Sequence, residues 1–202
     1  MKRTLLLLAG SPATGKSYLI DKIRQVVPNL VLISPDSIKE SLADKYGFDN
    51  LIEKEKLEIK VWQSYYHLLD DYMQIGQKVI VTEYPFSNKQ AFDLKFIATT
   101  YQYQIMTICL NAEFEILWKR RYQRDRELGR HLSHLVSSYH YGDELIDRDL
   151  ADNQITKKEF QDIIKKRAYS NFELGYTIKQ DVSDFTKVDY DALMQKVQTL
   201  VD

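Results

Sequence analysis

A glycine-rich segment near the start of the chain carries the clearest chemical signal. Residues 10–17 read Gly-Ser-Pro-Ala-Thr-Gly-Lys-Ser, which fits the pattern G-x-x-x-x-G-K-S. Gly10 and Gly15 allow the backbone to wrap closely around an anion, with successive N–H groups pointing inward. In loops of this type the lysine, here Lys16, reaches the β- and γ-phosphates, and the hydroxyl of Ser17 can bind Mg²⁺. The segment therefore predicts a binding site for a nucleoside triphosphate.

The residues on either side of this loop support that interpretation. Thr4 to Ala9 is an apolar run without a helical gap, as expected for a strand that is buried on both faces. From Tyr18 to Val27, apolar residues recur at helical spacing. A loop between a strand and a helix is the context that the motif requires, because the positive end of the helix then lies behind the anion. The predicted nucleotide-binding residues are Gly10, Ser11, Ala13, Thr14, Gly15, Lys16, Ser17 and Tyr18.

Two acids follow two further predicted strands. In an open parallel sheet, ligands bind at the carboxyl ends of the strands. Asp36 follows the second strand and is placed to accept the proton of a substrate hydroxyl, although a helix cap made by Asp36 or Ser37 is the alternative. Glu83 ends the third strand, where it could hold Mg²⁺, a Mg²⁺-bound water or a substrate hydroxyl. Lys39, one turn after Asp36, is placed to bind an anionic substrate.

A densely basic stretch follows the fourth predicted strand. It contains Arg120, Arg121, Arg124, Arg126 and Arg130. On a continued helix, residues 120 and 124 share one face, and residues 126 and 130 share another. A run of charge is usually a solvated face, and we assign that role to two or three of the five. Phosphoryl transfer needs cations around the charge that develops on the transferred group, and we predict that Arg120 or Arg124 supplies them together with Arg130.

Three histidines, His131, His134 and His140, follow within the same stretch. They raise the alternative of a zinc site. However, neither a cysteine nor a pair of acids accompanies them at the spacing of zinc ligands. We therefore assign no metal to them.

Alternation of short apolar runs with amphipathic stretches predicts a parallel α/β sheet covered on both faces. The predicted strands are residues 4–9, 30–33, 79–82, 104–110 and 176–179. The predicted helices are residues 18–27, 38–45, 51–75, 87–101, 111–118, 155–172 and 190–201. The intervening stretch from 131 to 150 has weak periodicity and is expected to form a flexible or helical excursion.

The composition excludes several classes of protein. The 202 residues include 28 Lys and Arg and 29 Asp and Glu, so the chain has no global positive field that would attract nucleic acid or an anionic membrane. Its single cysteine, Cys109, lies in an apolar run, which favours a buried thiol over a disulfide or a nucleophile. Met1 lies three residues before the first predicted strand, which leaves no room for a signal peptide, and no apolar run is long enough to span a membrane. We therefore expect a cytoplasmic protein.

Four segments together resemble the P-loop kinases of the polynucleotide 5′-kinase, zeta-toxin and chloramphenicol phosphotransferase-like group. They are the loop Gly10–Ser17, the strand end Ile33–Asp36, the strand Val79–Glu83, and the stretch from Leu110 to Arg124. The resemblance covers most of the chain. It implies a three-layer α/β/α P-loop fold with a five-stranded parallel sheet in the order 2-3-1-4-5. It also implies one kinase domain over residues 1–202, with residues 119–150 as a lid or insertion.

The same resemblance implies roles for individual residues. The donor would be ATP with Mg²⁺, and Asp36 would activate the acceptor hydroxyl. The predicted catalytic residues are Lys16, Asp36, Arg120, Arg124 and Arg130. The predicted substrate-binding residues are Lys39 and Glu83, and the predicted metal ligands are Ser17 and Glu83. Polynucleotide kinases usually have an arginine near the position of Asp36, where this chain has Lys39, and an aspartate in place of Glu83.

These observations predict an ATP-dependent kinase that phosphorylates a hydroxyl of a small molecule or of a nucleic-acid 5′ end. The alternative from a different class is a nucleotide-binding switch or weak ATPase that controls a protein partner. A GTPase is disfavoured because residues 88–91 read Asn-Lys-Gln-Ala and lack the aspartate of the N-K-x-D guanine motif. Turnover that an acceptor stimulates would distinguish the kinase from the switch.

Overall fold

The central strand of the fold is β1, Thr4–Gly10, in which every residue is buried. Its leucines alternate between the two faces of the sheet. Leu6 and Leu8 join the core cluster on one face, and Leu5 and Leu7 join the cluster on the other. A strand with apolar side chains on both faces needs a layer of helices on each side, which explains why the run lacks the polar alternation of a half-exposed strand.

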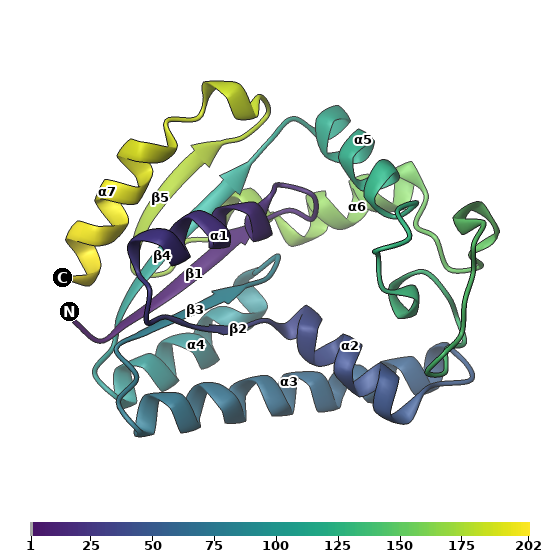
Figure 1. The fold of residues 1–202 in the computed structure, drawn as a ribbon, viewed down its shortest axis with the longest axis horizontal. Coiled ribbons are helices and arrows are strands. Elements are labelled where there is room, and N and C mark those ends of the chain that lie inside the picture. The colour runs from purple at the N-terminus through teal and green to yellow at the C-terminus, as the bar shows by residue number, and fades with distance from the viewer. Residues whose placement is uncertain (1) are drawn as a thin grey trace.

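The computed structural model describes residues 2–202, so Met1, the first residue of the expected domain, lies outside the described part (Figure 1). All five strands are parallel and form one sheet in the order β2-β3-β1-β4-β5. The other strands are β2 (Val31–Ile33), β3 (Val79–Glu83), β4 (Gln104–Asn111) and β5 (Tyr176–Asp181). The helices are α1 (Lys16–Val26), α2 (Pro35–Tyr46), α3 (Leu51–Gln74), α4 (Asn88–Thr100), α5 (Phe114–Arg124), α6 (Lys157–Arg167) and α7 (Tyr190–Val201). The predicted fold class and strand order are confirmed.

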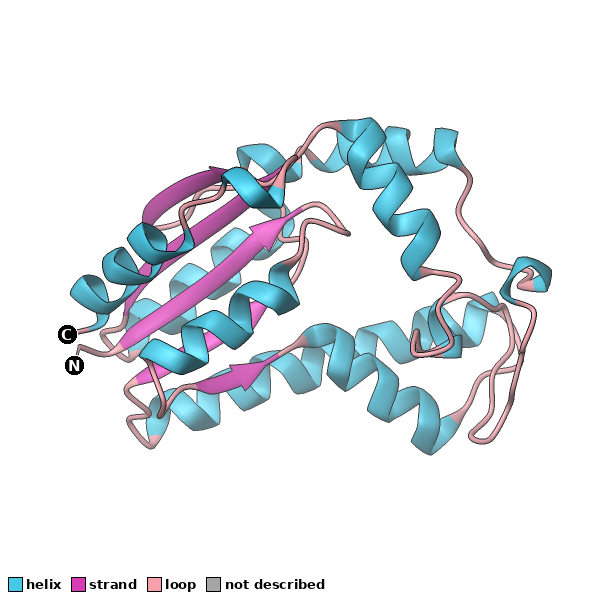
Figure 2. Cartoon of the chain, turned by 45° about the horizontal axis from the view of Figure 1, so that its top comes forward, coloured by secondary structure: helices cyan, strands magenta, loops and turns pink. Residues whose placement is uncertain are grey.

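Helices cover both faces of this sheet, which gives the three predicted layers (Figure 2). On one face, α1 and α7 pack together and contribute residues such as Ile23 and Val197 to the core. On the other face, α3 and α4 contribute residues such as Leu69 and Leu94. Among the helices of residues 2–202, none combines the length and the hydrophobicity that crossing a bilayer requires.

Helix α5 ends earlier than the charge pattern suggests. Its last residue is Arg124, and Asp125 is the C-cap. The chain then turns, since the N–H of Arg126 donates to the carbonyl of Gln123 at 3.0 Å. The prediction that Arg126 and Arg130 share a face of a continued helix is therefore wrong. Aspartate is a poor residue for a helix interior, and here its carboxylate binds the neighbouring arginine side chains while the chain leaves the helix.

The part of the 119–150 segment that follows α5 packs on α2 and α3 through a core of its own (Figure 1). Phe48, after α2, forms an antiparallel bridge with Tyr139. The ammonium group of Lys54 on α3 donates to the carbonyl of Val136 at 2.8 Å. The segment contains two short 3₁₀ turns, Leu132–His134 and Arg148–Leu150. Its weak periodicity thus reflects irregular backbone held by tertiary contacts.

Candidate active site

The glycine-rich segment forms the turn between β1 and α1. Gly10 has a φ of +122°, and a Cβ at this position would lie 2.2 Å from the carbonyl oxygen of Leu110 in β4. Gly15 is the N-cap of α1 and has a left-handed conformation, with a φ of +84°. Inside the turn, the buried hydroxyl of Thr14 donates to the carbonyl of Ser11 at 2.9 Å. Only glycine fits at position 10, and the loop is held by its own hydrogen bonds.

Lys16 reaches back over the loop. Its Nζ donates to the carbonyl oxygens of Gly10 at 3.1 Å and of Ser11 at 3.0 Å. Burial lowers the pKa of Lys16 to about 8, while the nearby carboxylates of Glu83 and Asp36 oppose the shift. An ammonium group held at this point, with carbonyls as its partners, is suited to exchange them for phosphate oxygens.

Ser17 and Glu83 meet beside this loop. Ser17 is in the first turn of α1, and Glu83 ends β3, which pairs with β1. The Ser17 hydroxyl donates to Oε2 of Glu83 at 3.2 Å. Burial raises the pKa of Glu83, and the charge of Lys16 opposes the shift. A hydroxyl and a carboxylate are hard oxygen ligands of the kind that Mg²⁺ takes together with water and phosphate oxygens, so the pair fits this ion.

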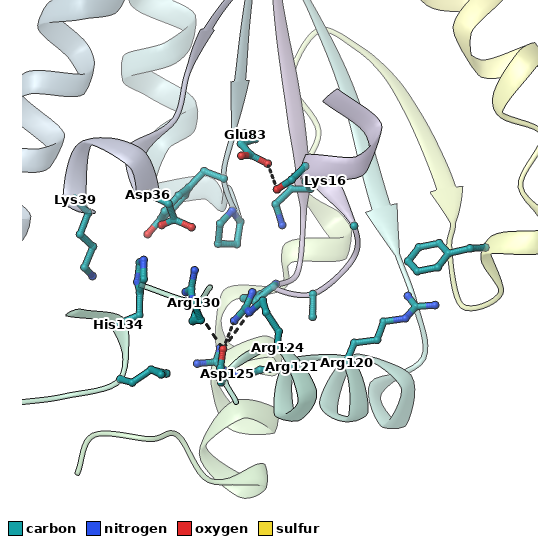
Figure 3. Close-up of a pocket in the computed structure, with 18 residues that line it drawn as sticks. Lys16, Asp36, Lys39, Glu83, Arg120, Arg121, Arg124, Asp125, Arg130 and His134 are labelled. Atoms are coloured by element: carbon teal, nitrogen blue, oxygen red, sulfur yellow. Dashed lines mark hydrogen bonds and ion pairs between the residues drawn. The ribbon is translucent and has the colours of Figure 1, made fainter. Parts of the chain in front are cut away.

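Asp36 lies in the first turn of α2, and its carboxylate lines the same cavity as Lys16 (Figure 3). The N-cap of α2 is Ser34, whose Oγ accepts a hydrogen bond from the N–H of Ser37 at 3.5 Å. The alternative in which Asp36 or Ser37 caps the helix is therefore wrong. The helix begins at Pro35, because proline is well suited to the first helical position, and this moves the cap to the preceding residue.

Lys39 follows one turn later on α2 and lines the same cavity. Its Nζ donates to Oε2 of Glu58 on α3 at 2.9 Å. This ion pair holds the Lys39 ammonium group near Asp36, and the Glu58 carboxylate compensates part of the Lys39 charge. Lys39 therefore lies where the prediction requires, with a protein carboxylate as its present partner.

Arg124 and Arg130 meet at Asp125 on the opposite wall (Figure 3). Nε and Nη2 of Arg124 donate to Oδ1 of Asp125 at 3.0 and 2.8 Å. Nε of Arg130 lies 3.8 Å from the same oxygen, and Nε of Arg121 lies 3.1 Å from Oδ2. The structure thus brings two of the three predicted catalytic arginines together and adds Arg121.

Arg120 lies to one side of this cluster. Its guanidinium carbon is 3.8 Å from the ring centroid of Phe185, in the segment between β5 and α7. Its Nη1 and Nη2 donate to the carbonyls of Val182 and Ser183 at 2.8 and 2.9 Å. The Phe185 ring also lies beside Gly15, where a Cβ would be 3.1 Å from it. Arg120 therefore links α5 to the segment that flanks the phosphate loop.

Each histidine of the 119–150 segment faces a carboxylate on α2 or in the turn after it. The pairs, by nitrogen-to-oxygen distance, are His131 with Asp44 at 3.1 Å, His134 with Glu40 at 2.7 Å, and His140 with Asp49 at 3.4 Å. Because each ring has a different partner, the three histidines do not converge on one point. Only His134 also lines the cavity.

A cavity of about 530 Å³ joins these walls. The predicted residues that line it are Ala13, Gly15, Lys16, Ser17, Asp36, Lys39, Glu83, Arg120, Arg124 and Arg130. Gly10, Ser11 and Thr14 lie behind its surface within the loop, and Tyr18 is exposed, with its ring 5.4 Å from that of Tyr190. Six of the lining side chains are cationic and three are acidic. This excess of positive charge suits a polyanionic ligand.

Sequence reasoning missed several residues of this cavity. They are Pro12, Tyr84, Pro85, Arg121, Asp125, His134, Leu135 and Phe185. Arg121 and Asp125 had a signal, because they lie within the basic stretch and one turn apart on a helix. His134 and Phe185 had none, because contacts between segments distant in sequence bring them to the cavity.

Acidification is expected to destabilise the protein through His134 and Glu40. Burial and the charge of Arg130 lower the pKa of His134, although Glu40 opposes this. Burial raises the pKa of Glu40, but the hydrogen bond and charge of His134 outweigh it, so that its pKa is lowered overall. The unfolded chain therefore binds more protons in both cases. Stability is lost as the pH falls below about 6.5 through His134, and below about 4.5 through Glu40.

Urea unfolding at several pH values measures this effect. His134→Asn should reduce the slope of the free energy of unfolding against pH between about pH 5 and 6.5. One histidine accounts for at most about 1.4 kcal/mol per pH unit of that slope. His67→Asn is the control, because His67 is exposed and pairs with Asp71 outside the cavity. Equal slopes in the wild type and in His134→Asn would contradict the prediction.

Comparison with known proteins agrees with this geometry. The sequence pattern of the zeta toxin family matches residues 1–143. Among solved structures, a kinase-like protein from Chloroflexus aurantiacus is 20% identical with a TM-score of 0.75, and 98% of each chain is covered. Shikimate kinase from Bacteroides thetaiotaomicron is 14% identical with a TM-score of 0.54, with 98% of each chain covered. A gluconokinase from Sinorhizobium meliloti is 9% identical with a TM-score of 0.53, over 98% of this chain and 91% of that one.

The structural likenesses, at these identities, show a shared fold. The family match goes further, because it spans well over half of the chain and includes the phosphate loop, both acids and the arginines around Asp125. The kinase-like P-loop fold and the sequence pattern therefore lead to the same assignment: this chain belongs to the zeta toxin family.

Proposed function

We propose that this protein is an ATP-dependent kinase that transfers the γ-phosphate of ATP to a hydroxyl group of a second substrate. The observation that carries the proposal is the convergence on one cavity of Lys16, Asp36, Glu83 and the arginines around Asp125. A phosphate loop, an acid for the attacking hydroxyl and cations for the transferred group are the parts that phosphoryl transfer requires. Membership of the zeta toxin family supports ATP as the donor.

The donor end of the cavity is the phosphate loop. Lys16 would release the carbonyls of Gly10 and Ser11 and bind the β- and γ-phosphates instead. Ser17 and Glu83 would hold Mg²⁺, the glutamate directly or through a water. When bound, this ion would neutralise charge on the phosphate oxygens. Arg124 and Arg130 would face the charge that develops on the transferred group.

The acceptor end lies between α2 and the 119–150 segment, where Asp36, Lys39 and His134 line the cavity. The acceptor hydroxyl would give its proton to the Asp36 carboxylate as its oxygen forms a bond to the γ-phosphorus. The bond from that phosphorus to the β,γ-bridging oxygen breaks, and ADP leaves. We assign the acceptor to two classes, a small molecule or a nucleic-acid 5′ end, with Lys39 as a contact for an anionic group.

The whole chain would act as one kinase domain in which residues 119–150 close over the phosphates. Support comes from the single sheet and from the position of the segment, which carries Arg120, Arg124 and Arg130 to the cavity. A lid that brings cations to the transferred group and excludes water would complete the site only when both substrates are bound.

A screen of acceptors tests this proposal. ADP formation from MgATP would be followed with alcohols, nucleosides, sugar nucleotides and oligonucleotides with a 5′-hydroxyl. At least one class should stimulate ADP formation and become phosphorylated in equal amount. ATP binding without stimulation by any class would favour the switch that controls a protein partner, and absence of ATP binding would exclude both.

A further inference from the structure

Asp125 is the hub of the arginine cluster. Its side chain is 9% exposed, and it lies at the C-terminal end of α5. Arg121 and Arg124 approach it from α5 at 3.1 and 2.8 Å, and Arg130 approaches from the following turn at 3.8 Å. All three guanidinium groups and the carboxylate line the cavity that contains the phosphate loop. One buried acid thus lies within 4 Å of three guanidinium groups.

One carboxylate cannot satisfy three guanidinium groups. Each guanidinium has five N–H donors, whereas a carboxylate offers about four acceptor positions. The Nε atoms of Arg121 and Arg130 are buried and have no hydrogen-bond partner among residues 2–202. Burial and the neighbouring arginine charges lower the pKa of Arg121 and of Arg130. Asp125 opposes this shift at Arg121, and Asp36 and then Asp125 oppose it at Arg130. One carboxylate against three guanidinium groups therefore leaves net positive charge on this wall of the cavity.

The other acids near the cluster do not replace Asp125. Glu40 lies 4.0 Å from Arg130 and is hydrogen-bonded to His134 at 2.7 Å. Within residues 2–202, Asp125 is the acid in ion-pair contact with Arg121 and Arg124. Without its charge, guanidinium groups this close together would repel each other in a poorly solvated site.

We propose that Asp125 is a positioning residue that holds Arg121, Arg124 and Arg130 ready for the transferred phosphoryl group. This inference rests on the proposed function of the cavity. It predicts that removal of the Asp125 charge weakens the binding of ATP, whereas simple competition between Asp125 and phosphate predicts the opposite change. An acid that only competes with phosphate weakens binding, so its removal tightens the binding of ATP. An acid that positions the arginines strengthens binding, so its removal weakens it.

The affinities of Asp125→Asn for MgATP and MgADP distinguish the positioning role from charge competition. We expect the affinity for MgATP, measured by calorimetry, to fall about ten- to a hundredfold, as for the loss of a charged hydrogen bond. The affinity for MgADP should change little, because the arginines face the γ-phosphate. A general structural defect would weaken both nucleotides together. Asp149→Asn is the matched control, since Asp149 is an exposed acid that pairs with Arg126 outside the cavity.

Tighter or unchanged MgATP binding in folded Asp125→Asn overturns the inference. If the variant does not fold, the wild type provides the test through the NMR signals of its arginine Nε–H groups. A slowly exchanging signal from Arg124, whose Nε donates to Oδ1 of Asp125 at 3.0 Å, would support a preformed cluster in the wild type, and a signal that exchanges as in a solvated arginine would overturn it. Failure of the wild type to bind ATP would count against the proposed function, and the NMR measurement would still test the cluster.

Discussion

Asp36→Asn is expected to lower phosphoryl transfer by about 10²–10⁴-fold, the usual contribution of a general base. Asparagine keeps the size of the side chain but cannot accept the proton of the attacking hydroxyl. ATP affinity should barely change, because Asp36 is assigned to the acceptor end of the cavity. Turnover with the acceptor found in the screen and ATP binding by calorimetry measure the two effects separately.

The position of Ser34 provides a control for this experiment. Ser34 caps α2, so Ser34→Ala should cost roughly 1 kcal/mol of stability and leave turnover per folded molecule largely intact. Asp36→Asn should show the reverse pattern, with full stability and little turnover. If turnover per folded molecule survives in Asp36→Asn, the base must be another group, and Glu83 is the next candidate.

Lys16→Ala is expected to lower turnover by about 10²–10³-fold, comparable to the loss of one donor to a transition-state oxyanion. The melting temperature should not fall, because the change removes a buried ammonium group that two loop carbonyls only partly compensate. ATP affinity should weaken as well. Lys22→Ala is the control, since Lys22 is on the outer side of α1 and contacts the rings of Tyr18 and Tyr190.

The pKa of Lys16 predicts a pH dependence of ATP binding that also tests the role of this residue. Because that pKa is about 8 in the free protein, the ammonium group loses its charge as the pH rises through this value. Binding of ATP to the wild type should therefore weaken above about pH 8. Lys16→Ala should lack this dependence. The same profile in both proteins would show that another group causes it.

The phosphate loop could be predicted because its signal is local, whereas the order of the strands was implied by the resemblance to the P-loop kinases. A glycine pattern between an apolar strand and an amphipathic helix needs no distant contact to be recognised. Asp36 and Glu83 followed from the rule that ligands lie at the carboxyl ends of parallel strands. The structure brings both acids to the cavity with Lys16. The predictions for Asp36 and Glu83 rest on the parallel α/β sheet that the alternation of strands and helices indicates.

The far wall of the cavity could not be predicted in this way. His134 reaches it because the 119–150 segment packs on α2, and the contacts that hold it there, such as those of Phe48 with Tyr139, join residues far apart in sequence. In the sequence, Asp125 is one acid within a densely basic stretch. The same charges were visible in the sequence, but their convergence depends on where α5 ends.

The position of β1 in the sheet also governs when the site can form during synthesis. Thr4 of β1 pairs with Val79 of β3 on one side and with Gln104 of β4 on the other. Until both partners have left the ribosome, the leucines of β1 have no sheet to join, and the loss of chain entropy on closing such long loops delays the pairing. Gly10 gains its neighbour Leu110 at the same late stage. The nucleotide loop is thus translated before β3 and β4, yet it takes shape only once β4 has been made.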